Sequence, residues 1–432
     1  MSKVASISPT RTTPAYIKAQ IGSPSQMLDV SGLPAEKSVG ALIEHAASMG
    51  SSDLFFCSAD GHVAVQVRHM GLVQPISIVT SDEGKRMLAH IRTASGADVN
   101  ERRKPGDGRW IYRRDSEDND EDIIDLRINF IPTMYGEDVA VRLLVRGHAL
   151  FNLEQLGMLP QQFASYVQMI EAPSGLVLIT GPTGSGKTAT LYSSLLHLND
   201  GKRKINTIED PVEYAVDGFH QSQVNSAINL GFAELLRAVL RQSPDVIMIG
   251  EVRDEETALT AVRAANSGLL VFATLHAPDT ASAVQSMRAL GVPAHFLASS
   301  LRGVVSQRLL RMLDPESRRP FDLVDAPDTF DEVKEFLQPG EGMTLYSHGP
   351  TEKNGMTGYS GRVGVFEVLS TTRVIRQLIA DGVSAGAIRK QAVAEKMLQF
   401  RHSALIKVAK GITSTEEIFR VVPNEQLLSD DY

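Results

Sequence analysis

A short glycine-rich segment constrains the fold of this chain more than any other feature. In LVLITGPTGSGKTATLYSSLL, residues Gly181–Thr188 match the pattern G-x-x-x-x-G-K-S/T. They lie between an apolar run typical of a buried strand and a run typical of a helix, the context in which this pattern binds phosphate. Glycines let backbone N–H groups converge on a phosphate at the helix N-terminus, where the helix dipole favours an anion. The alternative is an ordinary glycine-rich turn, and the spacing and flanking segments favour the phosphate loop.

The loop predicts which residues contact a nucleotide. We expect Lys187 to place its charge on the β- and γ-phosphates, and the Thr188 hydroxyl to ligate Mg²⁺. The predicted nucleotide-binding residues are Gly181, Pro182, Thr183, Gly184, Ser185, Gly186, Lys187, Thr188 and Ala189.

The loop belongs to a series of short, fully apolar strands separated by helical segments. Besides LVLIT these strands are KINTIE, DVIMIG and LLVFATL. Continuous apolar strands alternating with helices predict an α/β fold, with a parallel sheet that is covered on both faces.

Polar residues follow three of these strands. Parallel strands end at the ligand crevice, so Glu209, Glu251 and His276 are candidate site residues. Gly250 stands where such a strand usually carries aspartate, and we interpret Glu209 as the carboxylate that compensates by orienting or deprotonating the attacking water. Glu251 would then hold Mg²⁺ and its water shell, and the two glutamates could exchange these roles. His276 is expected to sense phosphate, with a structural histidine as the alternative, whereas Glu213 is expected to be an ordinary surface residue.

Composition and hydrophobic pattern divide the rest of the chain into segments. Residues 1–36 are rich in serine, threonine and proline and predict a flexible N-terminal extension. Residues 37–147 contain a helix that Gly50 ends, followed by alternating segments such as HVAVQVRHM and IIDLRINFI, and predict a small α+β domain. A linker is expected at 148–160, and a larger domain at 161–432 that becomes helical near its end.

Composition excludes several classes of protein. The formal net charge of -8 and a pI of about 5.8 give no support for wrapping a nucleic-acid backbone. A single cysteine, Cys57, rules out an intrachain disulfide framework and a multi-cysteine zinc site. No apolar run approaches the roughly 18 residues that span a bilayer, and the N-terminus lacks the apolar segment of a signal peptide. We therefore expect a cytoplasmic protein with no membrane span.

Taken together, these segments resemble the secretion ATPase superfamily of type II secretion and type IV pilus assembly. The resemblance covers about residues 37–422 and rests on the ordered set GPTGSGKT, TIEDPVEY, LRAVLRQSPD with GEVRD, and GLLVFATLHAPDTASAV. The segment GYSGRVGVFEVL is similar to the assembly and secretion branch rather than the retraction branch.

The resemblance implies a RecA-like P-loop NTPase domain, a smaller PAS-like N-terminal α+β domain and a helical C-terminal region. It further implies a homo-hexamer that hydrolyses Mg-ATP and docks on an inner-membrane platform protein, which would make the chain peripheral at the inner membrane. Arg127 and Arg142 interrupt apolar strands, and a solvated sheet face alone would explain them. The resemblance instead implies that both approach the γ-phosphate when the domains close, with Arg109 as a weaker third candidate.

Some positions depart from the family pattern. Relatives often carry a four-cysteine zinc site whose positions fall here on Asp314, Ser317, Thr351 and Asn354, so no zinc is expected. Three further family positions carry unusual residues, namely Phe55, Met70 and Ser243.

Three other functions remain open from the sequence. They are a retraction ATPase of the same superfamily, a RecA-class motor on nucleic acid, and a non-motor module that only binds ATP. The acidic pI argues against the nucleic-acid motor, and the presence of Glu209, Glu251 and His276 argues against the non-motor module.

Overall fold

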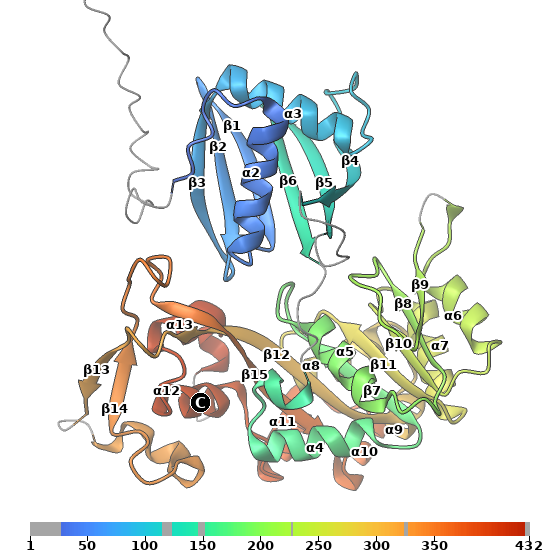
Figure 1. The fold of residues 1–432 in the computed structure, drawn as a ribbon. Coiled ribbons are helices and arrows are strands. Elements are labelled where there is room, and N and C mark those ends of the chain that lie inside the picture. Colours follow the sequence, from blue (N-terminus) through green and yellow to red (C-terminus); the bar gives the residue numbers. More distant parts are fainter. Residues whose placement is uncertain (1–26, 115–122, 146–151, 226–227, 324–326, 428–432) are drawn as a thin grey trace, which may run out of the picture. The chain divides into compact units, whose positions relative to one another are not determined.

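The computed structural model describes residues 27–114, 123–145, 152–225, 228–323 and 327–427. The chain divides into two compact units, Met1–His148 and Ala149–Tyr432, each of which is described by itself (Figure 1). Most of the predicted N-terminal extension, residues 1–26, lies outside the described residues, as does part of the predicted linker, residues 146–151.

The first unit is a six-stranded antiparallel sheet with two helices packed against it (Figure 1). The strand order is β3-β2-β1-β6-β5-β4, and β5 pairs with β6 across the turn at 134–135. Its elements are α2 (Ala35–Ser48), β1 (Asp53–Ala59), β2 (His62–His69), β3 (Leu72–Thr80), α3 (Ser81–Ala94), β4 (Gly106–Arg113), β5 (Ile123–Thr133) and β6 (Gly136–Val145).

The core of this unit follows from alternation along its strands. On β5, Ile124, Leu126 and Ile128 are buried with the apolar face of α2, while Arg127 between them is only half-buried. Val30 is also buried in this core, so part of the predicted N-terminal extension packs into the unit. The helix and alternating strands predicted for residues 37–147 are present.

The second unit is built on a seven-stranded sheet in the order β15-β12-β7-β11-β10-β8-β9. Its neighbours are parallel except for β12 and β15, which pair antiparallel. The strands are β7 (Gly175–Thr180), β8 (Ile205–Glu209), β9 (Phe219–Gln223), β10 (Val246–Ile249), β11 (Leu270–Leu275), β12 (Leu301–Leu313) and β15 (Tyr359–Ser370).

Helices cover both faces of this sheet. Along β7, Leu176 and Leu178 join one core, whereas Val177 and Ile179 join the core on the other face. This two-sided burial explains why the strand is apolar at every position from Leu176 to Ile179. The helices of the second unit that come before β12 in the chain are η3 (Leu153–Leu156), α4 (Pro160–Ile170), α5 (Lys187–Leu198), α6 (Phe232–Leu240), α7 (Glu255–Asn266), α8 (Thr280–Ala289) and α9 (Ala294–Ser300).

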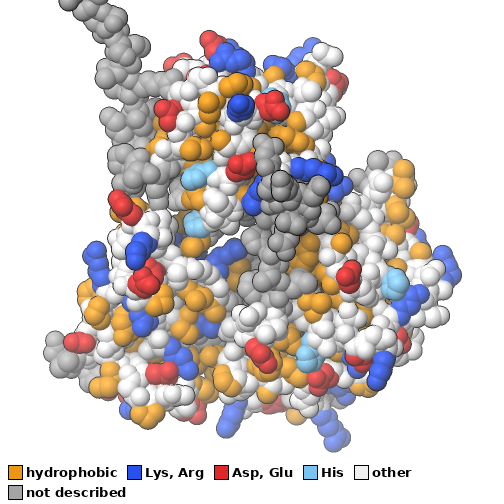
Figure 2. Space-filling view, in the orientation of Figure 1, with side chains coloured by type: hydrophobic (Ala, Val, Ile, Leu, Met, Phe, Trp, Pro, Cys, Tyr) orange, Lys and Arg blue, Asp and Glu red, His pale blue; other side chains and the backbone are white. Residues whose placement is uncertain are grey.

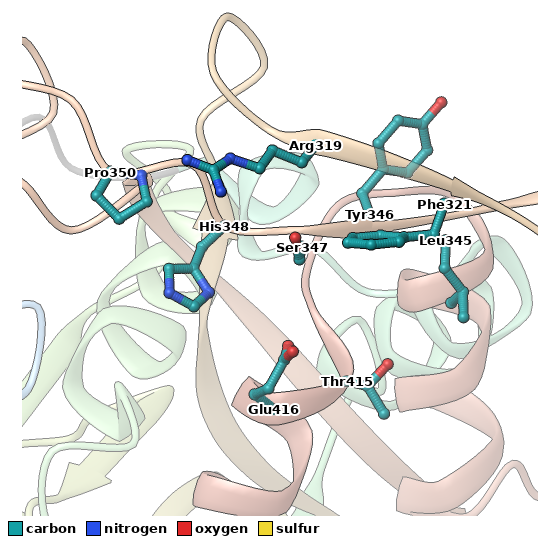
Figure 3. Close-up of a pocket in the computed structure, with 9 residues that line it drawn as sticks. All are labelled: Arg319, Phe321, Leu345, Tyr346, Ser347, His348, Pro350, Thr415 and Glu416. Atoms are coloured by element: carbon teal, nitrogen blue, oxygen red, sulfur yellow. The ribbon is translucent and has the colours of Figure 1, made fainter.

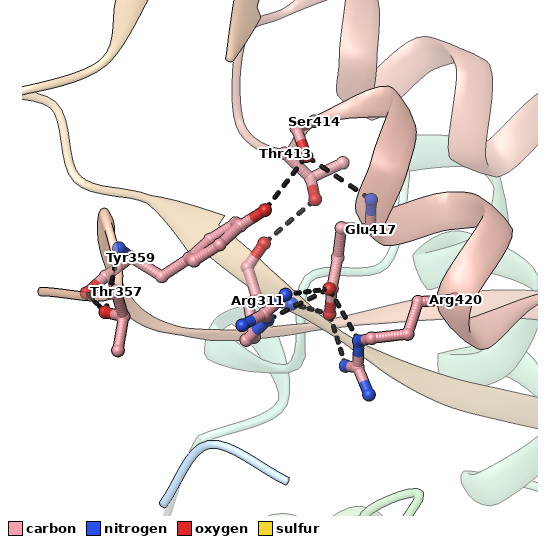
Figure 4. A network of polar contacts seen from close by, with 7 residues as sticks. All are labelled: Arg311, Thr357, Tyr359, Thr413, Ser414, Glu417 and Arg420. Atoms are coloured by element: carbon pink, nitrogen blue, oxygen red, sulfur yellow. Dashed lines mark hydrogen bonds and ion pairs between the residues drawn. The ribbon is translucent and has the colours of Figure 1, made fainter. Parts of the chain in front are cut away.

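The C-terminal region is helical, as predicted, and a buried glutamate ties its end to the sheet (Figure 4). Glu417 is fully buried and accepts hydrogen bonds from the backbone and side chain of Arg311 on β12 and from Arg420. Burial alone would raise the pKa of Glu417, but these hydrogen bonds outweigh burial and lower it. The elements are α10 (Arg373–Ala380), α11 (Ala385–Ala394), α12 (Phe400–Ala409), α13 (Thr415–Val421) and η6 (Asn424–Gln426).

A hydrogen-bonded cluster occupies Asp314, Ser317, Thr351 and Asn354, the four positions to which the family resemblance assigns zinc-binding cysteines. The Asn354 side-chain amide donates to Asp314 Oδ2 and Ser317 Oγ, both at 2.9 Å, and Ser317 Oγ donates to Asp314 at 2.8 Å. The Asn354 side-chain Oδ1 accepts from the Thr351 backbone N–H at 2.9 Å. The cluster closes the segment between β12 and β15, which also contains β13 (Arg319–Asp322), η5 (Pro327–Phe336) and β14 (Thr344–Ser347).

Because these hydrogen bonds already join the four positions, we expect the stability of the region to be independent of zinc. Elemental analysis of the purified chain is expected to find no stoichiometric zinc. A chelator that spares Mg²⁺ should leave the midpoint of thermal unfolding unchanged, whereas Asn354→Ala should lower it because it leaves polar groups unpaired. One tightly held zinc per chain would contradict this expectation.

Candidate functional site

The glycine-rich loop connects β7 to α5, and its backbone conformation requires glycine. Gly186 has a φ of 88°, in the left-handed region that side chains disfavour, immediately before α5 begins at Lys187. A Cβ at Gly181 would lie 2.4 Å from the Gln307 carbonyl oxygen, so a larger residue does not fit. A Cβ at Gly184 would meet nothing within 4 Å, which leaves that side of the loop open to a ligand.

A glutamine from a distant strand braces the loop. Gln307 on β12 is buried; its Nε2 donates to the Ser185 carbonyl oxygen at 2.8 Å, and its Oε1 accepts from Thr190 Oγ1 at 2.8 Å. Within the described residues, the buried Ser185 Oγ has no hydrogen-bond partner. An unpartnered hydroxyl in a loop with an open side fits a phosphate ligand. The sequence does not reveal the role of Gln307, because this residue lies more than a hundred residues from the loop.

Lys187 is folded back onto its own loop. Its Nζ donates to the carbonyl oxygens of Gly181 at 2.8 Å and Pro182 at 3.1 Å. Burial lowers the pKa of Lys187, and the nearby charge of Glu251 opposes that shift. An ammonium group held by carbonyl oxygens can exchange them for phosphate oxygens with little rearrangement.

Glu251 and His276 come together directly after their strands, β10 and β11. Glu251 Oε1 lies 3.0 Å from His276 Nε2, and Arg253 Nε donates to Glu251 Oε2 at 2.7 Å. Burial alone would raise the pKa of Glu251, but the hydrogen bond from Arg253 and the charges of Arg253, His276 and Lys187 lower it. Glu251 is therefore a carboxylate at neutral pH, near the loop lysine. The two predicted residues thus share one site, and Arg253 joins them.

Glu209 faces a different direction. It is 3% exposed, and its carboxyl group accepts hydrogen bonds from Tyr192 on α5, from Thr207 on β8 and from Gln221 on β9. The strand brings Glu209 to the expected edge of the sheet, but its side chain points into the protein. Its predicted role on the attacking water is therefore not one that this geometry favours.

Glu213, which was expected to be a surface residue, contacts the loop threonine. Thr188 Oγ1 donates to Glu213 Oε1 at 3.3 Å. A hydroxyl and a carboxylate side by side present the oxygen ligands that Mg²⁺ prefers, so the residues fit a magnesium ion at this place. One feature of the sequence could have indicated this contact, namely Pro211, which marks a turn after β8. That turn brings Glu213 back towards α5.

The three candidate arginines lie in one row across the sheet of the first unit. Arg109, Arg127 and Arg142 are cross-strand partners on β4, β5 and β6. Arg109 forms a bidentate ion pair with Asp125, and Arg142 Nε lies 3.2 Å from Asp53. The sequence did not reveal this row because it depends on the register of the strands.

Comparison with known proteins decides the family. The model of the family described as "Type II/IV secretion system protein" matches residues 30–420. The chain belongs to this family. Its relatives in this secretion family include the type II secretion system protein E of Dickeya dadantii, which is 36% identical over 91% of this chain and 76% of the relative. The type II secretion system ATPase E of Vibrio cholerae is 35% identical, over 90% of this chain and 75% of the relative. The type IV pilus assembly ATPase PilB of Pseudomonas aeruginosa is 36% identical, over 90% and 67%.

Solved structures confirm the RecA-like fold of this secretion-family chain. The Legionella pneumophila ATPase DotB aligns with a TM-score of 0.66 at 20% identity, covering 90% of this chain and 96% of DotB. The pilus retraction motor PilT aligns with a TM-score of 0.58 at 23% identity, covering 88% and 96%. Because the chain belongs to this family and its relatives are ATPases, it is an ATP-hydrolysing enzyme. Among the described residues, no helix is long and apolar enough to cross a bilayer.

A separate pocket of about 500 Å³ lies beside the β13–β14 ribbon and the start of α13 (Figure 3). Its lining comes from Arg319, Phe321, residues 345–348, Pro350, Thr415 and Glu416. These residues are distinct from the phosphate loop and from the strands that carry Glu209, Glu251 and His276.

Proposed function

We propose that the chain is a cytoplasmic, homohexameric motor that hydrolyses Mg-ATP to power pilus or pseudopilus assembly in a type II secretion or type IV pilus system. In this proposal the hexamer acts at the inner membrane through a platform membrane protein. The observation that supports it most is the convergence of Lys187, Thr188, Glu213 and Glu251 around the open loop. The relatives named as secretion and pilus assembly ATPases support a motor that drives assembly rather than retraction.

The proposal gives each of these residues one task. Lys187 leaves its loop carbonyls and binds the β- and γ-phosphates, while the loop N–H groups and Ser185 bind phosphate oxygens. Thr188 and Glu213 face the metal side, where bound Mg²⁺ would neutralise charge that develops on the phosphate oxygens. Glu251 orients or deprotonates the attacking water, and His276 beside it reports whether phosphate is present.

Two alternatives are less well supported. A retraction motor shares this fold, but the relatives in Dickeya dadantii and Pseudomonas aeruginosa are secretion and pilus assembly proteins. A motor on nucleic acid needs a basic track, whereas acidic and basic side chains are interspersed on the face shown in Figure 2. Adding single-stranded DNA to an ATPase assay separates the cases, because only a nucleic-acid motor is expected to be stimulated strongly.

The Glu251→Gln variant is expected to slow ATP turnover by about 10²–10⁴-fold, since it removes the acid–base group without changing its size. Binding of a fluorescent ATP analogue should survive. Glu256→Gln is the matched control, because Glu256 is exposed on α7 and paired with Arg237 on α6. Parental turnover in Glu251→Gln would remove Glu251 from the proposed chemistry.

A further inference from the structure

The carboxyl group of Glu209 is the centre of a buried network. Thr207 Oγ1 and Gln221 Nε2 donate to Glu209 Oε1 at 2.6 and 3.1 Å, and Tyr192 Oη donates to Glu209 Oε2. Glu209 is 3% exposed and Tyr192 is fully buried. A carboxyl group with three donors on its two oxygens, and almost no exposure, is poorly placed to bind an attacking water.

The same network holds the turn that follows β8. Gln221 Nε2 also donates to the Tyr214 carbonyl oxygen at 3.1 Å, and Gln221 Oε1 accepts from the Val216 N–H at 2.9 Å. The Tyr214 ring packs edge-to-face on the Tyr192 ring, with centroids 4.7 Å apart. The turn at 210–216 is therefore attached to α5 on one side and to β9 on the other.

Two contacts between α5 and this turn lie one helical turn apart. Thr188 and Tyr192 are at positions i and i+4, and therefore share a face of α5. Thr188 contacts Glu213, and Tyr192 contacts the neighbouring Tyr214. The contacts that hold Tyr214 against Tyr192 therefore also hold Glu213 against Thr188.

We propose that Tyr192, Glu209 and Gln221 are positioning residues that hold Glu213 against the Thr188 hydroxyl, so that Glu209 acts through the turn and not on water. This inference rests on the proposed function of Glu213 on the metal side of the site. It also answers why acidic residues cluster in TIEDPVEY, since the first glutamate anchors the turn that presents the last one.

The electrostatics of the network agree with this arrangement. Burial, followed by the nearby charge of Glu209, raises the pKa of Tyr192 far above its usual range. Its hydroxyl group therefore stays protonated, and remains a donor to Glu209, at any pH at which the enzyme is assayed.

A double-mutant cycle on the full-length chain tests the proposal. Tyr192→Phe is expected to lower kcat by about 10- to 100-fold, the usual scale for losing a group that orients a metal-site residue. In a Glu213→Gln background the same change should lower kcat by less than about 2-fold, because residues that act as one unit are not additive. Equal losses in both backgrounds would overturn the positioning role.

Tyr166→Phe is the matched control. Tyr166 is buried, and its hydroxyl group bonds Ser194 on the same helix α5 at 2.6 Å, away from the turn. We expect Tyr166→Phe to lower the unfolding midpoint about as much as Tyr192→Phe while leaving kcat unchanged. A matching loss of kcat in the control would assign the Tyr192 effect to helix stability and overturn the proposal.

The conservative variant of Glu209 separates an anchor from a base. Glu209→Gln keeps an acceptor oxygen for Thr207 and Gln221, and the Tyr192 hydroxyl can turn to accept from the new amide. It should therefore retain more than about a tenth of kcat, whereas Glu209→Leu should lose about as much as Tyr192→Phe. A loss of about 10²–10⁴-fold in Glu209→Gln would make Glu209 the base and overturn the proposal.

Failure of the proposed metal-side role gives a different result. If the Glu213→Gln single variant hydrolyses ATP at the parental rate, Glu213 is not part of the site. That result would overturn both the metal-side role of Glu213 and the positioning role of the buried network. A slow Glu213→Gln variant with fully additive effects of Tyr192→Phe overturns the positioning role alone.

Discussion

Replacing Arg127 or Arg142 by alanine is expected to slow ATP turnover by about 10³–10⁵-fold, while nucleotide affinity stays within a few-fold. Such a loss corresponds to about 4–7 kcal/mol of transition-state stabilisation. The ion pair that holds Arg142 to Asp53 is mostly exposed on the arginine side, and pairs of this kind contribute only about 0–1 kcal/mol. Releasing the arginine to a phosphate is therefore expected to cost little compared with the contribution predicted for it there.

Steady-state turnover and equilibrium binding of a fluorescent nucleotide check this expectation. Arg68→Ala is the matched control, because Arg68 lies in the same cross-strand row and pairs with the same Asp53. It should leave turnover within about 2-fold, as expected for an exposed ion pair. A chain that lacks residues 1–147 should bind ATP and barely hydrolyse it. If that chain turns over ATP as fast as the full chain, the arginines act only as surface residues.

Lys187→Ala is expected to reduce ATP hydrolysis below detection and to weaken nucleotide binding. The substitution removes the point charge expected on the β- and γ-phosphates. Within the described residues, the Lys187 ammonium group donates to the carbonyl oxygens of Gly181 and Pro182 in its own loop. The fold should therefore be unaffected, with an unfolding midpoint close to that of the parent.

Lys204→Ala is the control for this variant. Lys204 Nζ also donates to a backbone carbonyl oxygen, that of Gln242, but lies at the opposite end of β8 from the loop. It should hydrolyse ATP at the parental rate. Parental turnover in Lys187→Ala would show that the phosphates bind elsewhere.

The sequence was sufficient where one physical signal dominates. Fully apolar strands, a glycine-rich turn and a lysine–threonine pair predict the sheet, the loop and the start of α5. Alternation similarly predicts β2, β5 and β6. It does not predict β4, whose residues alternate between half-buried and exposed at the edge of the sheet. An alternating pattern can be recognised in a sequence only when one face of the strand is buried in the core.

Side-chain direction was less predictable because β8 is buried at every position. When both faces of a strand are covered, polarity does not tell which face a terminal glutamate uses, so Glu209 could not be assigned inward. Glu213 depends on a turn whose path is set by Gln221 and Tyr192, which are separated from it in sequence. The brace by Gln307 and the arginine row depend on strand register, which no local pattern encodes.

The amide cluster around Asn354 changes what this chain needs in order to mature. A hairpin closed by four cysteines is complete only after a metal has been captured, and it opens when its thiols are oxidised. Here the closing groups are an amide, a carboxylate and hydroxyls, which reach their final state as soon as the backbone folds. We therefore expect newly made chains to complete this region when zinc is scarce or thiols are oxidised.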